Sequence, residues 1–194
     1  DYNMLAQRFP NGESGFTVFS GVFQVGQDLP WLNTVDVRPA GHTVRPGFNQ
    51  YLNQYHSAKA AVWDSTANTM HSIFFGGLSR YTLDTITNTL LDDPNVPFVR
   101  TISMITRFAN DSTVEYKMPV EMPALTGSSA EFIPVITTDD EMIRLNSIPP
   151  VKTLIGSIVG GIESTLPNIF FINTGVESFA STRIFKVYIV KDNT

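Results

Sequence analysis

The sequence predicts an all-β fold, and three observations lead to that prediction. Gly and Pro, 13 and 12 of the 194 residues, punctuate the whole chain. Few windows show the 3.6-residue apolar period of an amphipathic helix, whereas several short runs are rich in aromatic and β-branched residues. Charged residues make up only 16% of the chain and hydrophobic residues 42%. This balance, the opposite of that in disordered chains, indicates a folded protein with a large buried fraction.

The first half of the chain contains a predicted strand and a predicted hairpin. Residues 15–24 are rich in aromatic and β-branched residues and are expected to form a strand that bends at Gly21. Residues 60–75 are expected to form a hairpin around a polar turn. The side chains of Asp64 and Asn68 can close that turn by bonding the local backbone.

The second half continues in the same way. A second hairpin is expected over residues 98–118, around a turn of the composition Ala-Asn-Asp-Ser. Residues 153–159 and 184–190 are apolar runs of strand length. The one helix candidate is the Thr-rich segment 83–91. Proline cannot donate to a sheet ladder, so loops or edge strands are expected at 119–123 and 149–150.

Two segments of the chain end alike. Residues 71–79 and 155–164 each contain an apolar strand, then a Gly-Gly pair, then an aliphatic and a polar residue. A strand that ends in a crowded place leaves no room for Cβ, and glycine also permits a positive φ. We therefore expect structural roles for the two pairs, which are Gly76, Gly77, Gly160 and Gly161.

An apolar strand that ends in Gly-Gly after a polar hairpin resembles the blade of a kelch-type β-propeller. The turn at residues 63–69 adds to this resemblance, although Met70 stands where kelch blades often carry an aromatic residue. The spacing also differs from the regular period of roughly 50 residues in kelch repeats. The expected fold is a kelch-like β-propeller or a fragment of one, and a β-sandwich is the alternative. We expect residues 1–194 to be a single β-rich domain, the C-terminal part of a longer chain.

A second resemblance rests on five short segments that occur in order along the chain. Together they resemble a poorly characterised family of exported Bacteroidota proteins, often fitted with a type IX secretion sorting domain. The segments are residues 68–77, 95–103, 121–123, 130–134 and 184–187. The resemblance implies an exported protein of the cell surface or extracellular medium, and it implies no reaction. The expected partners are other protein segments or subunits of a surface assembly.

Composition excludes several classes of partner and site. The net charge is −5, and the 13 Lys and Arg residues are scattered singly, so the chain has no basic patch of the kind that binds nucleic acid. Cysteine is absent, which removes disulfides, thiolate nucleophiles and Cys-type zinc sites. No apolar run approaches the roughly 18 residues that a transmembrane helix needs, so no membrane span is predicted.

The motifs of catalysis and metal binding are weak. The three histidines, His42, His56 and His71, show no metal-ligand spacing, and the acidic runs at 92–93 and 139–141 do not match a calcium loop. No nucleophile elbow or phosphate-binding loop is present. We therefore predict no catalytic residue, no metal and no cofactor. A propeller-type hydrolase acting on glycans or peptides is kept as the alternative to a structural or binding protein.

One segment carries a candidate binding site. Aromatic residues lie beside amide side chains over residues 48–55, and such a combination can stack on and hydrogen-bond a sugar or a peptide. An aromatic core beside an irregular loop is the other interpretation. The loops at 50–56 and 118–132 are expected to form the recognition surface. The candidate binding residues are Trp31, Gln50, Tyr51, Tyr55 and His56.

Overall fold

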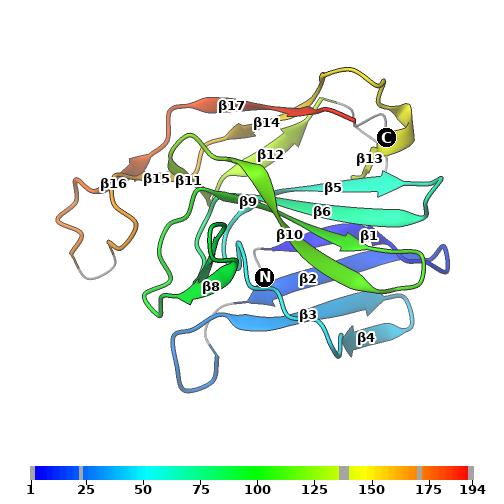
Figure 1. The fold of residues 1–194 in the computed structure, drawn as a ribbon, viewed down its shortest axis with the longest axis horizontal. Coiled ribbons are helices and arrows are strands. Elements are labelled where there is room, and N and C mark those ends of the chain that lie inside the picture. The colour runs from blue at the N-terminus through cyan, green and yellow to red at the C-terminus, as the bar shows by residue number, and fades with distance from the viewer. Residues whose placement is uncertain (1–2, 22–23, 136–139, 170–171, 192–194) are drawn as a thin grey trace.

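The computed structural model describes residues 3–21, 24–135, 140–169 and 172–191 (Figure 1). The structure is 54% strand, and its described residues contain no α-helix, only the short 3-10 turn η1 (Leu145–Ser147). The predicted all-β fold class is confirmed.

Three main sheets, antiparallel apart from one short strand, follow one another along the chain. The N-terminal sheet consists of β1 (Met4–Arg8), β2 (Ser14–Gly21), β3 (Trp31–Arg38) and β4 (Gly41–Val44), paired in that order. The central sheet consists of β5 (Ala58–Asp64), β6 (Thr69–Phe75), β9 (Thr101–Arg107) and β10 (Thr113–Glu121), with the short β13 (Ile143–Arg144) parallel to β5. The C-terminal sheet consists of β12 (Glu131–Pro134), β14 (Thr153–Val159) and β17 (Ile184–Ile189).

The remaining strands form smaller pairings. A hairpin of β7 (Tyr81–Asp84) and β8 (Thr89–Asp92) is inserted between β6 and β9. A narrow sheet is formed by β11 (Leu125–Ser128), β15 (Ile162–Ser164) and β16 (Ser178–Ala180).

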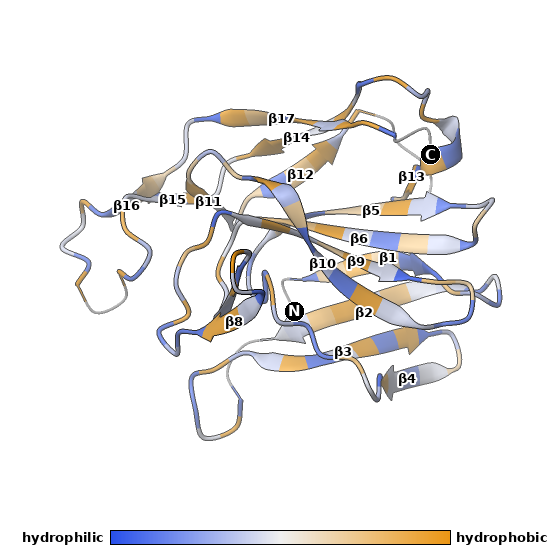
Figure 2. Ribbon diagram, in the orientation of Figure 1, coloured by the Kyte–Doolittle hydropathy of each residue, from blue (hydrophilic) through white to orange (hydrophobic). Residues whose placement is uncertain are grey.

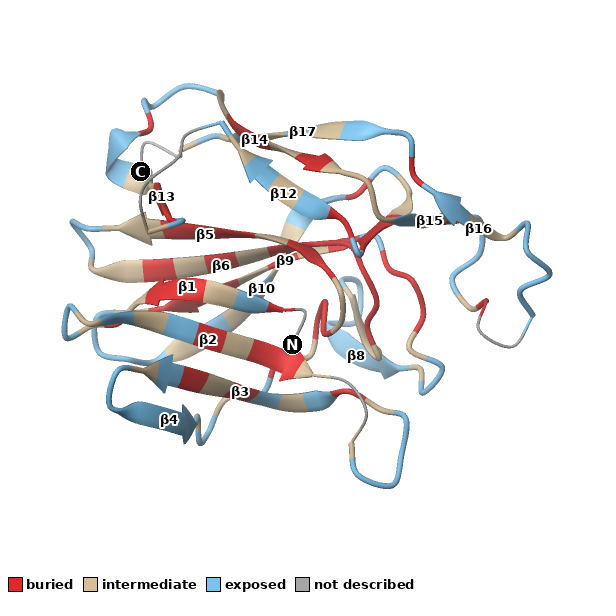
Figure 3. Cartoon of the chain, turned by 180° about the vertical axis from the view of Figure 1, so that it is seen from behind, coloured by how far each residue is buried: buried red, intermediate tan, exposed pale blue. Residues whose placement is uncertain are grey.

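The central sheet packs against the N-terminal sheet on one face and against the C-terminal sheet on the other. Successive side chains of a strand point to opposite faces of the sheet, so Phe74 and Phe75 of β6 pack on opposite faces. Phe74 packs edge-on against Phe19 of the N-terminal sheet, with ring centroids 5.2 Å apart. Phe75 stacks on Phe132 of the C-terminal sheet at 6.0 Å. Figure 3 accordingly shows β5, β6 and β9 as mainly buried, whereas β4 and β8 are exposed.

Local sequence accounts for both predicted hairpins. In the turn between β5 and β6, Asp64 Oδ1 accepts the backbone N–H groups of Thr66 at 2.8 Å and Ala67 at 3.1 Å, as expected. Asn68 behaves differently, because its Nδ2 donates to the distant Pro10 carbonyl at 2.9 Å. Between β9 and β10, Asn110 Oδ1 accepts the N–H of Ser112 at 3.0 Å. The strand predicted over residues 15–24 is found as β2, and its continuation at 22–23 lies outside the described residues.

The predicted helix over residues 83–91 is wrong. This segment contains parts of β7 and β8 and the turn between them. Its β-branched threonines favour an extended backbone, and Asp84 Oδ1 stabilises the turn by accepting the N–H of Ile86 at 2.8 Å. Asn88, with a φ of 54°, supplies the left-handed residue of the turn.

The two glycine pairs end the second strands of the central and C-terminal sheets. A Cβ at Gly76 would lie 2.0 Å from the Thr126 carbonyl oxygen, and one at Gly161 would lie 2.5 Å from that of Ser128. Gly77 is similarly crowded, whereas Gly160 has open space around it. All four have a positive φ. The segment that leads from the central sheet into the C-terminal sheet, and contains Thr126 and Ser128, thus passes directly over Gly76 and Gly161.

Candidate functional site

An apolar groove lies between the central and C-terminal sheets. Its volume is about 610 Å³. Residues of β6, β9 and β10 form one wall and β17 forms the other. The lining of the groove includes Ile102, Met104, Met118, Val120, Phe185 and Val187.

The groove arises from a difference in width between the two sheets. Antiparallel register pairs Tyr116 of β10 with Met104 of β9, so both side chains lie on the face of the central sheet that is turned toward the C-terminal sheet. Among the described residues, the C-terminal sheet ends at β17. The outer half of the central sheet therefore has no strand above it. Figure 2 shows that hydrophobic positions occur along both β10 and β17.

The wall of the groove is adaptable as well as apolar. Three methionines, Met104, Met118 and Met122, lie in it. The methionine side chain is flexible and polarisable, and it adjusts to ligands of irregular shape. The segment 118–132, predicted as part of the recognition surface, contributes Met118, Val120 and Met122 to this groove. The sequence did not indicate the rest of the groove, because its other residues come from strands far apart in the chain.

Few polar groups reach the groove. His71 on β6 is hydrogen-bonded through Nδ1 to Thr106 Oγ1 at 2.9 Å, and its Nε2 lies 3.3 Å from Thr69 Oγ1. Burial lowers the pKa of His71 below its ordinary value near 6.5, and the nearby Asp64 offsets this only in part. The imidazole is therefore neutral at pH 7. At the rim, Glu121 pairs with Lys117 at 3.2 Å.

The residues predicted as a binding cluster belong to a segment that joins the sheets. Gln50 is fully buried, and its Nε2 donates to the carbonyls of Leu52 at 3.0 Å and Asn53 at 3.2 Å. Its backbone N–H donates to Leu32 of β3 at 2.8 Å. Tyr51 packs edge-on against Tyr81, with ring centroids 5.3 Å apart.

The other predicted residues extend this junction. The rings of Tyr55 and His56 are in contact, with centroids 4.0 Å apart. Tyr55 exchanges backbone hydrogen bonds with Leu78, and His56 Nδ1 lies 2.7 Å from Ser129 Oγ. Trp31 is 45% exposed on β3 and stands outside this network of side chains. Segment 50–56 thus contacts the N-terminal sheet, the central sheet and the start of the C-terminal sheet.

The carboxylate of Glu115 anchors the same segment from β10. It accepts the backbone N–H groups of Tyr51 at 2.7 Å and Leu52 at 3.1 Å. Burial raises the pKa of Glu115 to about 8, and the two N–H donors act in the opposite direction. Glu115 pairs with Ile105, which packs against the N-terminal sheet. Glu115 and His71 therefore lie on opposite faces of the central sheet.

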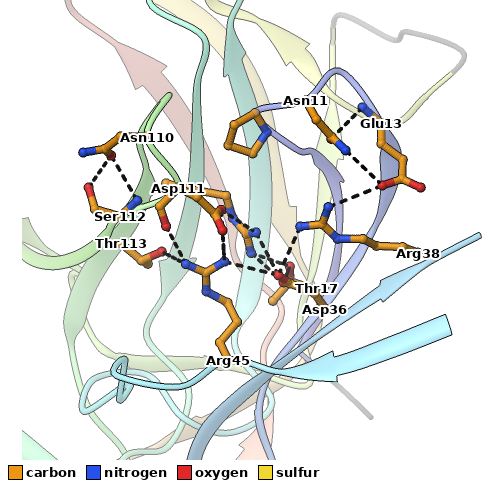
Figure 4. Close-up of polar contacts among 12 residues, drawn as sticks. Asn11, Glu13, Thr17, Asp36, Arg38, Arg45, Asn110, Asp111, Ser112 and Thr113 are labelled. Carbon is orange, nitrogen blue, oxygen red and sulfur yellow. Dashed lines mark hydrogen bonds and ion pairs between the residues drawn. The ribbon is translucent and has the colours of Figure 1, made fainter. Parts of the chain in front are cut away.

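A buried ion pair joins the N-terminal and central sheets on that second face, and Figure 4 shows its carboxylate partner, Asp36, beside Thr17 and Arg45. Arg107 donates to the two oxygens of Asp36 at 2.5 and 2.8 Å, and both side chains are only 4% exposed. Thr17 Oγ1 and Arg45 also donate to Asp36. Burial alone would raise the pKa of Asp36, but the hydrogen bonds and charges of these neighbours outweigh it and hold the pKa below its ordinary value. The ion pair thus links the N-terminal sheet to the central sheet.

The described residues contain no cluster of three or more His, Asp or Glu side chains that could hold a metal ion. In the same part of the chain, no helix is long and apolar enough to span a membrane. Comparison with known proteins found no matching family model, no significantly similar curated protein and no significantly similar solved structure.

Proposed function

We propose that this protein is a binding domain and that the apolar groove between its central and C-terminal sheets is the binding site. The observation that carries the proposal is the groove itself, with a volume of about 610 Å³. That volume falls within the roughly 300–1,000 Å³ of ligand-binding pockets, which are mostly apolar with a few polar groups. The groove of this protein has the same character, since three methionines line it and His71 is neutral at pH 7.

The proposed scaffold is a stack of kelch-like propeller blades. Each of the three main sheets pairs strands that are consecutive apart from inserted segments. A residue with a positive φ lies at the end of the second strand of each sheet: Ser20 at 53° is the last but one residue of β2, and Gly76 at 62° and Gly160 at 71° directly follow β6 and β14. Face-to-face packing of such sheets supports a fragment of a propeller over a two-sheet sandwich. Export to the cell surface, within a larger assembly, is proposed from the sequence resemblance.

The alternative, a hydrolase acting on glycans or peptides, would require ionisable groups that converge in one pocket. Glu115 has a strongly raised pKa, but its carboxylate faces the N-terminal sheet and is occupied by two backbone donors. His71 lies on the other face, toward the groove. Their separation favours the binding domain.

Binding of the apolar dye anilinonaphthalene sulfonate tests the proposal. The dye should bind saturably, and Val120→Asp should weaken its binding at least tenfold, because Val120 lines the groove and is 60% exposed. The matched control is Val44→Asp, at a position on β4 that is 54% exposed and lies outside the groove. Equal binding to both variants, or no saturable binding, would contradict the proposal. Circular dichroism checks that both variants fold.

A further inference from the structure

The edge of β17 borders the groove. In the described part of the chain, β17 pairs with β14 on one side only, so its other edge carries unpaired backbone N–H and C=O groups. The N-terminal sheet has a fourth strand, β4, beside its third, and the central sheet has β10 beside β9. The C-terminal sheet has three strands among the described residues. The groove lies where its fourth strand would be.

The surface beneath that place is apolar and exposed. On the groove-facing side of β10, Val114 is 40% exposed, Tyr116 41% and Val120 60%. The opposite side of the same strand is occupied by the N-terminal sheet, where Arg45, which follows β4, donates to Asp111 at 3.1 Å and Thr113 at 2.9 Å. On that face, the residue that follows the fourth strand of the N-terminal sheet reaches β10, whereas the described residues of the C-terminal sheet form no fourth strand.

We propose that the groove receives an extended polypeptide strand from a partner protein, which pairs antiparallel with β17 and completes the C-terminal sheet. The inference rests on the proposed function and names its ligand class. The antiparallel direction follows that of β3 with β4 and β9 with β10. Addition of a strand to an exposed sheet edge is a general mode of peptide recognition, in which the backbone supplies affinity and alternate side chains supply specificity.

The side chains of β17 indicate the pattern of the partner strand. Phe185, Val187 and Ile189 are partly buried in the core toward the central sheet, so alternate partner residues should be apolar to cover Met104 and Met118. Lys186 is exposed on the outer face of β17. Beside it, the Lys152 ammonium group lies 4.7 Å from the centre of the Tyr188 ring. Acidic residues at the other positions of the partner would complement these charges.

A second copy of this chain does not fit the groove in the same way. If two β17 strands paired about a two-fold axis, each would lie above the outer half of the other copy's central sheet, in a place where Phe185 and Val187 already pack on the central sheet of their own copy. The two central sheets would then compete for the same space. A single inserted strand fills the space, which is why we assign the site to a separate polypeptide segment.

The test uses a blocked eight-residue peptide of alternating valine and glutamate, carrying a fluorescent label, and two derivatives. One derivative is N-methylated at every valine and the other at every glutamate. In a strand, alternate backbone N–H groups point to the same edge, so only one derivative loses its donors toward β17. We expect saturable binding of the parent peptide by fluorescence anisotropy and a loss of at least tenfold for one derivative only. Hydrogen exchange should slow in β17, and Val120→Asp should weaken binding while Val44→Asp does not.

Each other outcome has a distinct meaning. If the dye binds in a Val120-dependent way but no peptide binds, or both derivatives bind like the parent, strand addition is overturned and the groove stays a binding site for other apolar ligands. If neither dye nor peptide binds, the proposed function fails as well. If sedimentation shows a dimer that Val120→Asp dissociates, the occupant is a second copy and the inference is again overturned.

Discussion

Replacement of Asp36 by alanine should destabilise the fold severely. The mutation would leave the Arg107 guanidinium, 4% exposed, without the carboxylate to which it donates at 2.5 and 2.8 Å. Removing one partner of a buried ion pair costs about 3–5 kcal/mol, and the remaining contact of Arg107 with the half-exposed Asp111, at 3.3 Å, compensates its charge only in part. For a domain of this size, roughly 2–4 °C of melting temperature is lost per kcal/mol. The expected fall in Tm is therefore roughly 6–20 °C.

Urea unfolding at pH 7 measures this loss. The folded-state pKa of Asp36 is lowered from its ordinary value near 3.8, so its contribution is fully present above that value and is lost as the pH falls through the folded-state pKa. The matched control is Asp92→Ala. Asp92 accepts two hydrogen bonds from Arg80 at 2.7 Å but is 45% exposed, and such a pair contributes about 1 kcal/mol or less.

A double variant of the ion pair tests the same explanation. Replacement of both partners, Asp36→Leu with Arg107→Met, should recover most of the lost stability, because an apolar pair of similar volume removes both charges of the pair, while Arg45 keeps its ion pair with Asp111 at 3.1 Å. A loss below about 1 kcal/mol for Asp36→Ala, as for an exposed pair, would refute the argument. So would a double variant as unstable as the single one.

The remaining predictions concern the glycines and the junction. Gly127→Ala should cost about 1–3 kcal/mol more than Gly160→Ala in urea unfolding. Both glycines have a positive φ, but only the Cβ at position 127 would meet an atom, the Phe75 carbonyl oxygen at 2.1 Å. Equal losses of stability would remove the steric argument. Since burial raises the pKa of Glu115 from 4.5 to about 8, its contribution to stability should decline as the pH rises between those values, and Glu115→Gln should flatten that dependence. Asn53→Ala should cost about 1–3 kcal/mol, because its Nδ2 donates to the buried carbonyls of Gly76 at 2.6 Å and Thr101 at 2.8 Å; a loss near zero would mean that water replaces these bonds.

The elements that the sequence predicted well are those set by local interactions. The turn at Asp64 forms because a short carboxylate side chain reaches the N–H groups two and three residues on. The failed helix at 83–91 shows the limit of this approach. Its apolar residues suit either structure, and the outcome depended on β-branched threonines and on Asp84 at the turn.

The candidate binding residues show a different limit. An amide beside aromatic side chains is a feature of recognition loops and of buried junctions alike. For Gln50, the difference lies in its two acceptors, the carbonyls of Leu52 and Asn53, and in its full burial. Both depend on how segment 50–56 meets three sheets, which composition does not encode.

By itself, the sequence determined that this protein is built from short strands, where its principal hairpins turn and which glycines end its strands, because these properties depend on residues a few positions apart. Only the tertiary structure decided where the apolar groove lies. Met104, Met118 and Phe185 belong to ordinary amphipathic strands, and their alternation is the same whether a neighbour covers them or not. The groove exists because two sheets of unequal width pack together, and that mismatch depends on strands far apart in the chain.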